Sequence, residues 1–166
     1  MLRQNNNGYE LIQSDDSQGG RFEFRPMREE DIEIVYDLDK IISPAPWSRQ
    51  AFYNELENSK ADSYVVTEAD KIIAYAVIWW ISDELHIGTI GTAREFRHQG
   101  IASRILSNVF AKAHCNSVKK AYLEVGESNL PALALYTKFG FNREGLRKNY
   151  YTQNRENALL MSVNLG

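Results

Sequence analysis

The feature that most constrains the fold is a series of strand-like segments followed directly by one amphipathic helical segment. Residues 64–67, 71–81 and 84–92 look like strands separated by short turns, which predicts a three-strand meander. From about Gly100 to His114, apolar residues recur at steps of three and one, which predicts a helix with one apolar face. A chain with this order must cover a sheet with at least one helix.

Further segments extend this pattern in both directions. Towards the N-terminus we expect a strand over residues 21–25, a helix around residues 32–38 and a second helix that begins at Ser48, whose hydroxyl can cap it. Towards the C-terminus we expect a strand over residues 121–125, a short helix that ends before Gly140, and strands over residues 141–147 and 158–165. The order β α α β β β α β α β β predicts a mixed α/β or α+β domain with a mostly meandering sheet, not a doubly wound fold.

The composition fits one globular domain. The chain has 166 residues, of which 43% are hydrophobic and 25% are charged, close to the average for such a domain. Residues 1–20 carry few apolar side chains and no sustained period, so we expect a flexible N-terminal leader there. Residues 21–166 are expected to form a single domain.

Charge and cysteine content argue against several classes of protein. The 19 Lys and Arg against 22 Asp and Glu give a net charge of -3, so we expect no direct nucleic-acid partner. The longest apolar run, residues 72–81, is shorter than the ~20 residues that span a bilayer, so we expect no membrane segment. A single cysteine, Cys115, and the lack of Cys/His clusters with zinc-ligand spacing predict a cytoplasmic protein without a metal site.

Residues 94–102 join the last strand of the predicted meander to the amphipathic helix. The unpaired N–H groups of a first helical turn and the positive end of the helix dipole favour an anion, and Gly100 permits its close approach. Arg94, Arg97 and Arg104 add positive charge. The alternative is an ordinary solvated helix start. The segment lacks the glycine patterns of a P-loop or a dinucleotide site.

The sequence resembles a known family. The pattern Arg97-x-x-Gly100-x-Ala102, between a strand and a helix, resembles the acyl-CoA pyrophosphate loop of the GCN5-related N-acetyltransferases. Further motifs follow in the order and spacing of the ribosomal-protein-alanine N-acetyltransferase branch: Leu123-Glu124-Val125, Glu127-Ser128-Asn129, Leu135-Tyr136, Gly140-Phe141 and Tyr150-Tyr151. The resemblance covers residues 21–166.

Three other positions bear on this resemblance. The segment Pro46-Trp47-Ser48 resembles the substrate-side loop of the branch. Two residues depart from its pattern, because Gly126 stands where the branch commonly has Arg, and Asn157 stands where Asp often follows Glu156. These departures concern the substrate and not the fold.

The resemblance implies a fold, an activity and a set of partners. The implied fold is a central, mostly antiparallel sheet flanked by helices. The implied reaction moves the acetyl group of acetyl-CoA to the N-terminal α-amine of a protein, with the N-terminal alanine of a small-subunit ribosomal protein as the expected acceptor. The implied mechanism is direct attack of the amine, without a metal.

The resemblance also implies roles for individual residues. Glu124 is the expected general base and Tyr136 the expected acid that protonates the leaving thiolate. The substrate-binding residues are expected to be Trp47, Tyr150 and Tyr151. The acetyl-CoA-binding residues are expected to be Ile90, Gly91, Thr92, Arg97, His98, Gln99, Gly100, Ile101, Ala102, Ser103 and Asn129.

Some of these roles also have support from the residues themselves. Glu124 lies mid-strand and faces opposite to its neighbours, and an ionisable side chain there is costly without a partner or a role, although a solvated face would accept it. Gly88 and Gly91 are unusual in a strand and permit a bulge or close approach of a ligand. The phenol of Tyr136 can protonate a thiolate, although a half-buried packing tyrosine would look the same. Cys115 is expected to pack and not to act as a nucleophile.

The three histidines, His86, His98 and His114, are expected to be structural or exposed, since none belongs to a recognisable catalytic motif. Two other functions stay open at this stage. One is the acetylation of a small-molecule amine, and the other is a non-catalytic acyl-CoA sensor, which the presence of both Glu124 and Tyr136 disfavours.

Overall fold

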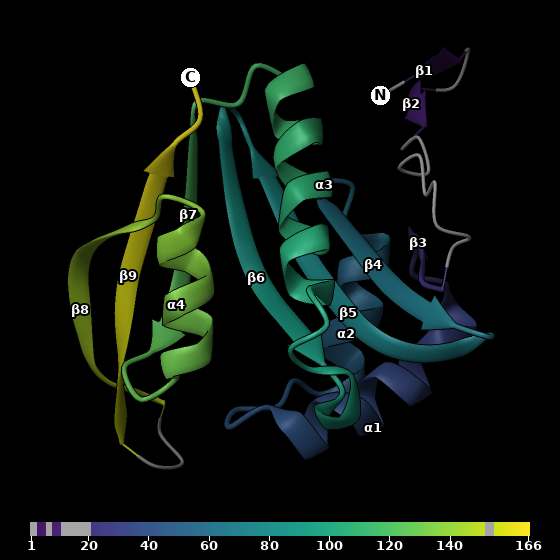
Figure 1. Cartoon of the computed structure of the whole chain (residues 1–166), viewed down its shortest axis with the longest axis horizontal. Coiled ribbons are helices and arrows are strands. Elements are labelled where there is room, and N and C mark those ends of the chain that lie inside the picture. The colour runs from purple at the N-terminus through teal and green to yellow at the C-terminus, as the bar shows by residue number, and fades with distance from the viewer. Residues whose placement is uncertain (1–2, 6–7, 11–20, 152–154) are drawn as a thin grey trace.

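The computed structural model describes residues 3–5, 8–10, 21–151 and 155–166 (Figure 1). Within the predicted leader, β1 (Arg3–Asn5) pairs with β2 (Gly8–Glu10) as a two-stranded antiparallel sheet. The rest of residues 1–20 lies outside the described residues. The predicted boundary between a leader and a single domain therefore stays a prediction.

A seven-stranded sheet forms the centre of the molecule, in the order β3-β4-β5-β6-β7-β9-β8. Every neighbouring pair is antiparallel except β6 and β7, which are parallel. This confirms the predicted mixed fold. The strands are β3 (Glu23–Pro26), β4 (Ala61–Glu68), β5 (Lys71–Ile81), β6 (Glu84–Thr92), β7 (Lys120–Gly126), β8 (Asn142–Tyr151) and β9 (Glu156–Asn164).

Helices cover both faces of this sheet, with α3 and α4 on one face and α1 and α2 on the other (Figure 1). Ser48 caps α2 as predicted, because its side chain accepts a hydrogen bond from the Ala51 backbone N–H at 3.1 Å. Among the described residues, no helix is long and apolar enough to cross a membrane. The helices are α1 (Ile32–Ile42), α2 (Arg49–Glu57), α3 (Ile101–Cys115) and α4 (Leu130–Lys138), with short 3-10 turns η1 (Glu29–Asp31) and η2 (Arg94–Phe96).

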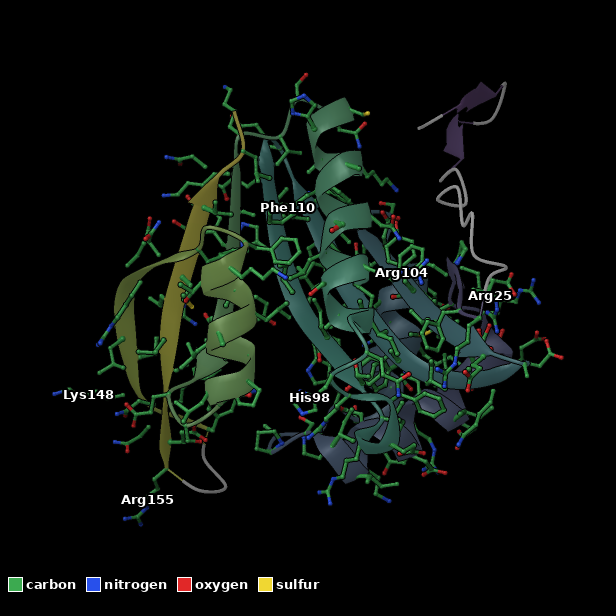
Figure 2. All side chains as sticks on the ribbon, in the orientation of Figure 1. Arg25, His98, Arg104, Phe110, Lys148 and Arg155 are labelled. Carbon is green, nitrogen blue, oxygen red and sulfur yellow. The ribbon has the colours of Figure 1, made fainter. Side chains whose placement is uncertain are left out.

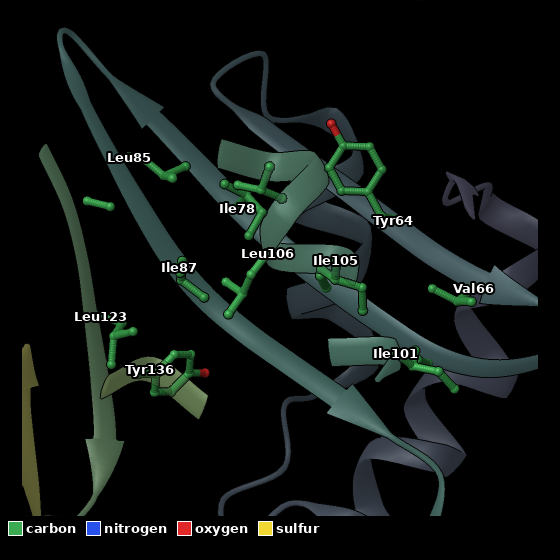
Figure 3. Packing of buried hydrophobic residues seen from close by; sticks show 14 of the residues in the cluster. Tyr64, Val66, Ile78, Leu85, Ile87, Ile101, Ile105, Leu106, Leu123 and Tyr136 are labelled. Carbon is green, nitrogen blue, oxygen red and sulfur yellow. The ribbon is translucent and has the colours of Figure 1, made fainter. Parts of the chain in front are cut away.

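Two hydrophobic cores hold these layers together. The apolar face predicted for α3 packs on the sheet through Ile101, Ile105 and Leu106 (Figure 3). Phe110 points from α3 towards α4 and contacts Phe139 edge-on, with the ring centroids 5.8 Å apart (Figure 2). On the other face, a second core lies between the sheet and α1 and α2.

The structure differs from the sequence prediction at a few positions. The first meander strand starts earlier, at Ala61, and β8 continues to Tyr151 because it stays paired with β9 beyond a register shift. The expectation that Cys115 packs in the core is wrong. Cys115 is the last residue of α3 and is exposed, because the apolar face of the helix ends with the buried Ala113.

Candidate active site

Strands β6 and β7 pair only at their first residues. Their parallel register covers residues 84–87 of β6 and 120–123 of β7, and beyond it β7 pairs with β9 alone. Within the described chain, the later part of β6 therefore pairs only with β5. The predicted acetyl-CoA residues Ile90, Gly91 and Thr92 lie in this part of β6. The backbone N–H and C=O groups on the edge of β6 that faces β7 can bind a ligand that contains amides here.

Both glycines of β6 lie under aromatic rings. The β5–β6 register shifts by one residue at Gly88, so a bulge, one of the two arrangements that glycine permits here, occurs at this position. A Cβ atom at Gly88 would come within 2.7 Å of the Trp79 ring, and one at Gly91 within 2.3 Å of the Tyr75 ring. Glycine at these positions therefore lets two large rings pack directly on the backbone of β6.

The loop between η2 and α3 has the geometry of an anion site. His98 and Gly100 both have positive φ angles, 61° and 78°, and His98 lies at this end of α3 (Figure 2). Gly100 is the N-cap residue, and no side-chain hydrogen bond caps it in the described chain. The first turn of α3 contains Ile101, Ala102 and Ser103. The backbone N–H groups of this turn are thus available to a ligand.

The remaining loop residues contribute in different ways. The Arg97 side chain donates to the carbonyl oxygen of Thr92 at 3.3 Å and so connects the loop to the end of β6. Gln99 donates to the Glu95 carbonyl oxygen at 3.2 Å. The Ile101 side chain is buried in the core, so only the backbone of this residue can reach a ligand.

A polar atom at the end of β6 supports this assignment. The Thr92 hydroxyl oxygen, Oγ1, is buried and has no hydrogen-bond partner among the described residues. Buried polar atoms normally have a partner, and such an atom beside a ligand site is one that the ligand can satisfy. Asn129, an expected acetyl-CoA-binding residue, caps α4 by accepting from the Ala132 N–H at 3.3 Å.

An open cleft of about 720 Å³ brings together four residues that the sequence predicted, namely Trp47, Glu124, Tyr150 and Tyr151. Its walls come from the α1–α2 loop and from β5 to β9. Its other lining residues are Ala45, Trp79, His86, Ile87, Gly88, Tyr122, Leu123, Glu144, Arg147, Leu160 and Met161.

Glu124 lies in this cleft with two partners from β8. Its Oε1 atom lies 2.7 Å from Nη1 of Arg147, and the Glu124 side chain is 26% exposed. Tyr150 also forms a hydrogen bond with Glu124, and this bond, with burial, raises the pKa of the Tyr150 phenol. A carboxylate held in this way has a defined position, which a proton acceptor for an incoming amine needs.

Arg147 is a residue of the cleft that the sequence did not predict. No signal along the chain connects Arg147 to Glu124, since their contact depends on the pairing of β7 with β9 and of β9 with β8. His86 is a second residue of the cleft that the sequence did not predict. Its Nε2 atom lies 2.8 Å from a Glu84 oxygen, and its ring stacks on Tyr122.

Tyr136 is not among the residues that line the cleft. It is on α4, is 8% exposed and packs in the core against Phe141 (Figure 3). Burial, together with the nearby Tyr151 phenol, raises the pKa of Tyr136 to about 12. Val125 packs in that same core and does not line the cleft, whereas Glu124 lines the cleft. The predicted acid and base thus lie on opposite faces of β7.

The two residues that depart from the family pattern lie beside separate hydrogen bonds between β9 and the β7–α4 loop. A Cβ at position 126 would come within 2.5 Å of a Glu156 oxygen, so Gly126 leaves room for that carboxylate to accept from Ser128. The Asn157 amide donates to Glu127 at 2.9 Å. An aspartate at position 157 could not donate this bond and would repel Glu127.

Comparisons with known proteins identify the family of this chain. The sequence model described as the acetyltransferase (GNAT) family matches residues 32–141. The chain belongs to this family. A Bacillus subtilis protein provisionally named a ribosomal protein bS18-alanine N-acetyltransferase is 37% identical over 142 residues, covering 85% of this chain and 94% of that protein. The ribosomal protein bS18-alanine N-acetyltransferase of Haemophilus ducreyi is 31% identical, covering 82% and 96%.

Solved structures of GNAT proteins have the same fold. The crystal structure of the ribosomal-protein-S18-alanine N-acetyltransferase from Escherichia coli matches with a TM-score of 0.81 at 26% identity, covering 87% of this chain and 94% of that chain. A GNAT family acetyltransferase from Elizabethkingia anophelis, solved with acetyl-CoA bound, matches with a TM-score of 0.71 at 25% identity, covering 87% and 98%. GNAT acetyltransferases use acetyl-CoA. No group of three or more metal-ligating side chains occurs among the described residues.

Proposed function

We propose that this GNAT protein transfers the acetyl group of acetyl-CoA to the N-terminal α-amine of a protein, with the N-terminal alanine of ribosomal protein bS18 as the acceptor. The main observation is the carboxylate of Glu124, held by Arg147 and Tyr150 in an aromatic cleft beside the unpaired edge of β6. The names of the relatives support the ribosomal acceptor. Such an acceptor implies that the enzyme works in the cytoplasm.

Each part of the site has a task in this reaction. Acetyl-CoA supplies a thioester whose carbonyl carbon the amine attacks. The first turn of α3 binds the pyrophosphate, and the backbone of residues 90–92 binds the pantetheine arm and polarises the thioester. Asn129 adds a contact to this arm. Trp47, Tyr150 and Tyr151 orient the acceptor in the cleft.

The proton movements involve two residues. Glu124 accepts the proton of the α-ammonium group, directly or through one water, so that a neutral amine can attack. Tyr136 donates its phenolic proton to the departing thiolate. With its pKa raised to about 12, this phenol is protonated throughout the neutral range and can act as the donor.

The chemistry favours an α-amine over a lysine side chain. The reference pKa of an α-amine is about 7.7–8.0 and that of lysine about 10.4. Near neutral pH an α-ammonium group therefore loses its proton to a carboxylate base much more easily than a lysine side chain does. The net charge of -3 is compatible with a basic ribosomal-protein segment, although so small a charge steers an acceptor weakly.

Acetylation of paired peptides tests this function. Two peptides that start with alanine and contain one internal lysine would differ only in a blocked or free N-terminus, and mass spectrometry would locate the acetyl group. We expect acetylation of the free N-terminus alone. Equal acetylation of both peptides would indicate a side-chain acceptor. No acetylation of either would favour a small-molecule amine or a non-catalytic acyl-CoA sensor.

The base is tested with Glu124→Gln. We expect kcat/KM for the free peptide to fall about 100-fold or more, and the loss to be largest at low pH, where more of the amine is protonated. Glu127→Gln is the matched control, because Glu127 is exposed and the amide oxygen of the new glutamine can still accept the hydrogen bond from Asn157. A Glu124→Gln enzyme with wild-type turnover would exclude this carboxylate as the base.

A further inference from the structure

Asp39 is a buried ionisable group to which the proposed reaction gives no role. Asp39, near the C-terminal end of α1, is 1% exposed. Its Oδ2 atom accepts a hydrogen bond from the Trp47 backbone N–H at 2.7 Å, and its Oδ1 atom accepts one from the Tyr75 hydroxyl. The Ser43 side chain forms a further hydrogen bond with it, while burial raises the pKa of this carboxyl. A buried acid is costly unless its oxygens accept hydrogen bonds, and the donors of these bonds come from the α1–α2 loop and from β5.

The segment that Asp39 holds is the loop between α1 and α2. Pro44 and Pro46 have no N–H group, so three backbone donors are left between positions 43 and 47. The Ser43 N–H donates to the Asp39 carbonyl oxygen at 2.8 Å, and the Ala45 N–H donates to the Ser43 hydroxyl at 3.2 Å. The third donor, the Trp47 N–H, is the one that ends on the Asp39 carboxylate, whereas the Ser43 bond ends on the Asp39 backbone.

This loop forms one wall of the proposed acceptor cleft. The Trp47 ring stacks on Trp79, with the ring centroids 6.0 Å apart and the planes 12° apart, and both residues line the cleft. Because the stack depends on where the loop places Trp47, the bond between Asp39 and the Trp47 N–H sets the position of this wall.

The Asp39 carboxylate is also connected, through Tyr75, to β6, the strand that is proposed to bind acetyl-CoA. Tyr75, which donates to Asp39, has a further hydrogen bond with the Thr89 side chain. Its ring packs directly on Gly91 of β6. Asp39 thus connects the acceptor wall to the strand that is proposed to bind acetyl-CoA, and a fixed relative position of two reactants is a large part of the rate of a bimolecular reaction.

We propose that Asp39 is a positioning residue that sets where the acceptor lies relative to acetyl-CoA, by holding the Trp47 loop against β5 and β6. This inference rests on the proposed function only in taking the cleft as the acceptor site. It assigns Asp39 no contact with either substrate.

Hydrogen exchange in the wild-type protein directly tests the hydrogen bond between the Trp47 N–H and Asp39. With ¹⁵N-labelled tryptophan, NMR resolves the backbone N–H groups of the three tryptophans, Trp47, Trp79 and Trp80. We expect the Trp47 N–H to exchange about 100-fold or more slowly than an unprotected amide, although it lies in a loop. The Trp80 N–H, which donates to the Lys60 carbonyl oxygen at 2.7 Å, is the reference. An unprotected Trp47 N–H would overturn the proposal.

Steady-state kinetics of three variants test whether Asp39 affects the binding of the acceptor peptide. Asp39→Ala removes both acceptor atoms, Asp39→Asn keeps one side-chain oxygen, and Asp37→Ala removes the same charge from an exposed position of α1. For Asp39→Ala we expect KM for the acceptor peptide to rise about tenfold or more, with acetyl-CoA affinity within about threefold of wild type. Asp39→Asn should be intermediate, and Asp37→Ala unchanged.

A purely structural role would give a different pattern. It would lower kcat through a smaller active fraction and leave both KM values unchanged, and this result, or an unchanged KM for the peptide in a folded Asp39→Ala enzyme, would overturn the proposal. If the alanine variant does not fold, the wild-type exchange measurement decides by itself. Failure of the proposed function is a separate outcome, because it appears as a wild-type enzyme that does not acetylate the peptide.

Discussion

Tyr136 is a buried phenol whose ring and hydroxyl have separable tasks. The ring packs against Phe141 at 5.6 Å in the core, and phenylalanine would preserve that contact. The hydroxyl is the proposed proton donor to the leaving thiolate. For Tyr136→Phe we therefore expect kcat to fall by roughly 100-fold or more with little change in acetyl-CoA affinity, measured by steady-state kinetics and calorimetry.

The raised pKa adds a further expectation for the wild-type enzyme. Because the pKa of Tyr136 is raised to about 12, this group keeps its proton through the neutral and mildly basic range. Loss of its proton therefore should not limit turnover there. Near wild-type turnover of Tyr136→Phe would reduce this residue to a packing role.

At the scale of the element, the start of α3 is the part of the site that depends most on one helix. Gly100 has a φ angle of 78°, and a Cβ there would meet nothing within 4 Å, so a side chain would project into the space in front of the helix N-terminus. Gly100→Glu places a negative charge where the pyrophosphate is proposed to bind. We expect calorimetry to detect no binding of acetyl-CoA to this variant.

The matched control for this element is Gly100→Ala. Alanine has the same backbone strain at a positive φ angle, about 1–2 kcal/mol, but no charge. It should therefore lower stability slightly and keep most of the acetyl-CoA affinity. Unchanged affinity in a folded Gly100→Glu protein would move the pyrophosphate site elsewhere.

At the scale of the whole molecule, one ion pair connects the edge of the sheet to the helices behind it. Arg25 of β3, labelled in Figure 2, donates to both carboxylate oxygens of Asp31 at 2.7 and 2.9 Å. Asp31 is 4% exposed. The hydrogen bond from Arg25 lowers the pKa of Asp31 below 3.8. This contribution to stability is present above pH 3.8 and is lost as the pH falls through the lowered pKa.

The Asp31→Asn variant tests this contribution. Near pH 7 we expect urea unfolding to show a loss of about 2 kcal/mol, and this difference should shrink as the pH falls below 3.8 through the lowered pKa of Asp31. Glu33→Gln removes an exposed carboxylate that pairs with Arg49 at 2.7 Å, and it should change stability little at either pH. A pH-independent loss in Asp31→Asn would show that the charge of Asp31 is not the cause.

The parts of the site that the sequence could predict are those built from neighbouring residues. The turn that ends at Gly100 and the caps at Ser48 and Asn129 depend on hydrogen bonds over one helical turn, so their signals are contained in a few consecutive positions. The alternation that exposes Glu124 and buries both of its neighbours is equally local. The family resemblance then added chemical roles that such patterns cannot supply.

The sequence by itself therefore determined the order of the elements, the apolar face of α3 and the loop that precedes it, because helix and strand periods are properties of short segments. Only the tertiary structure decided that Arg147 pairs with Glu124, that Asp39 holds the Trp47 N–H, and that β6 and β7 part after four paired residues. Each of these contacts joins segments distant along the chain. Their positions follow from strand register and layer packing, which no local pattern encodes.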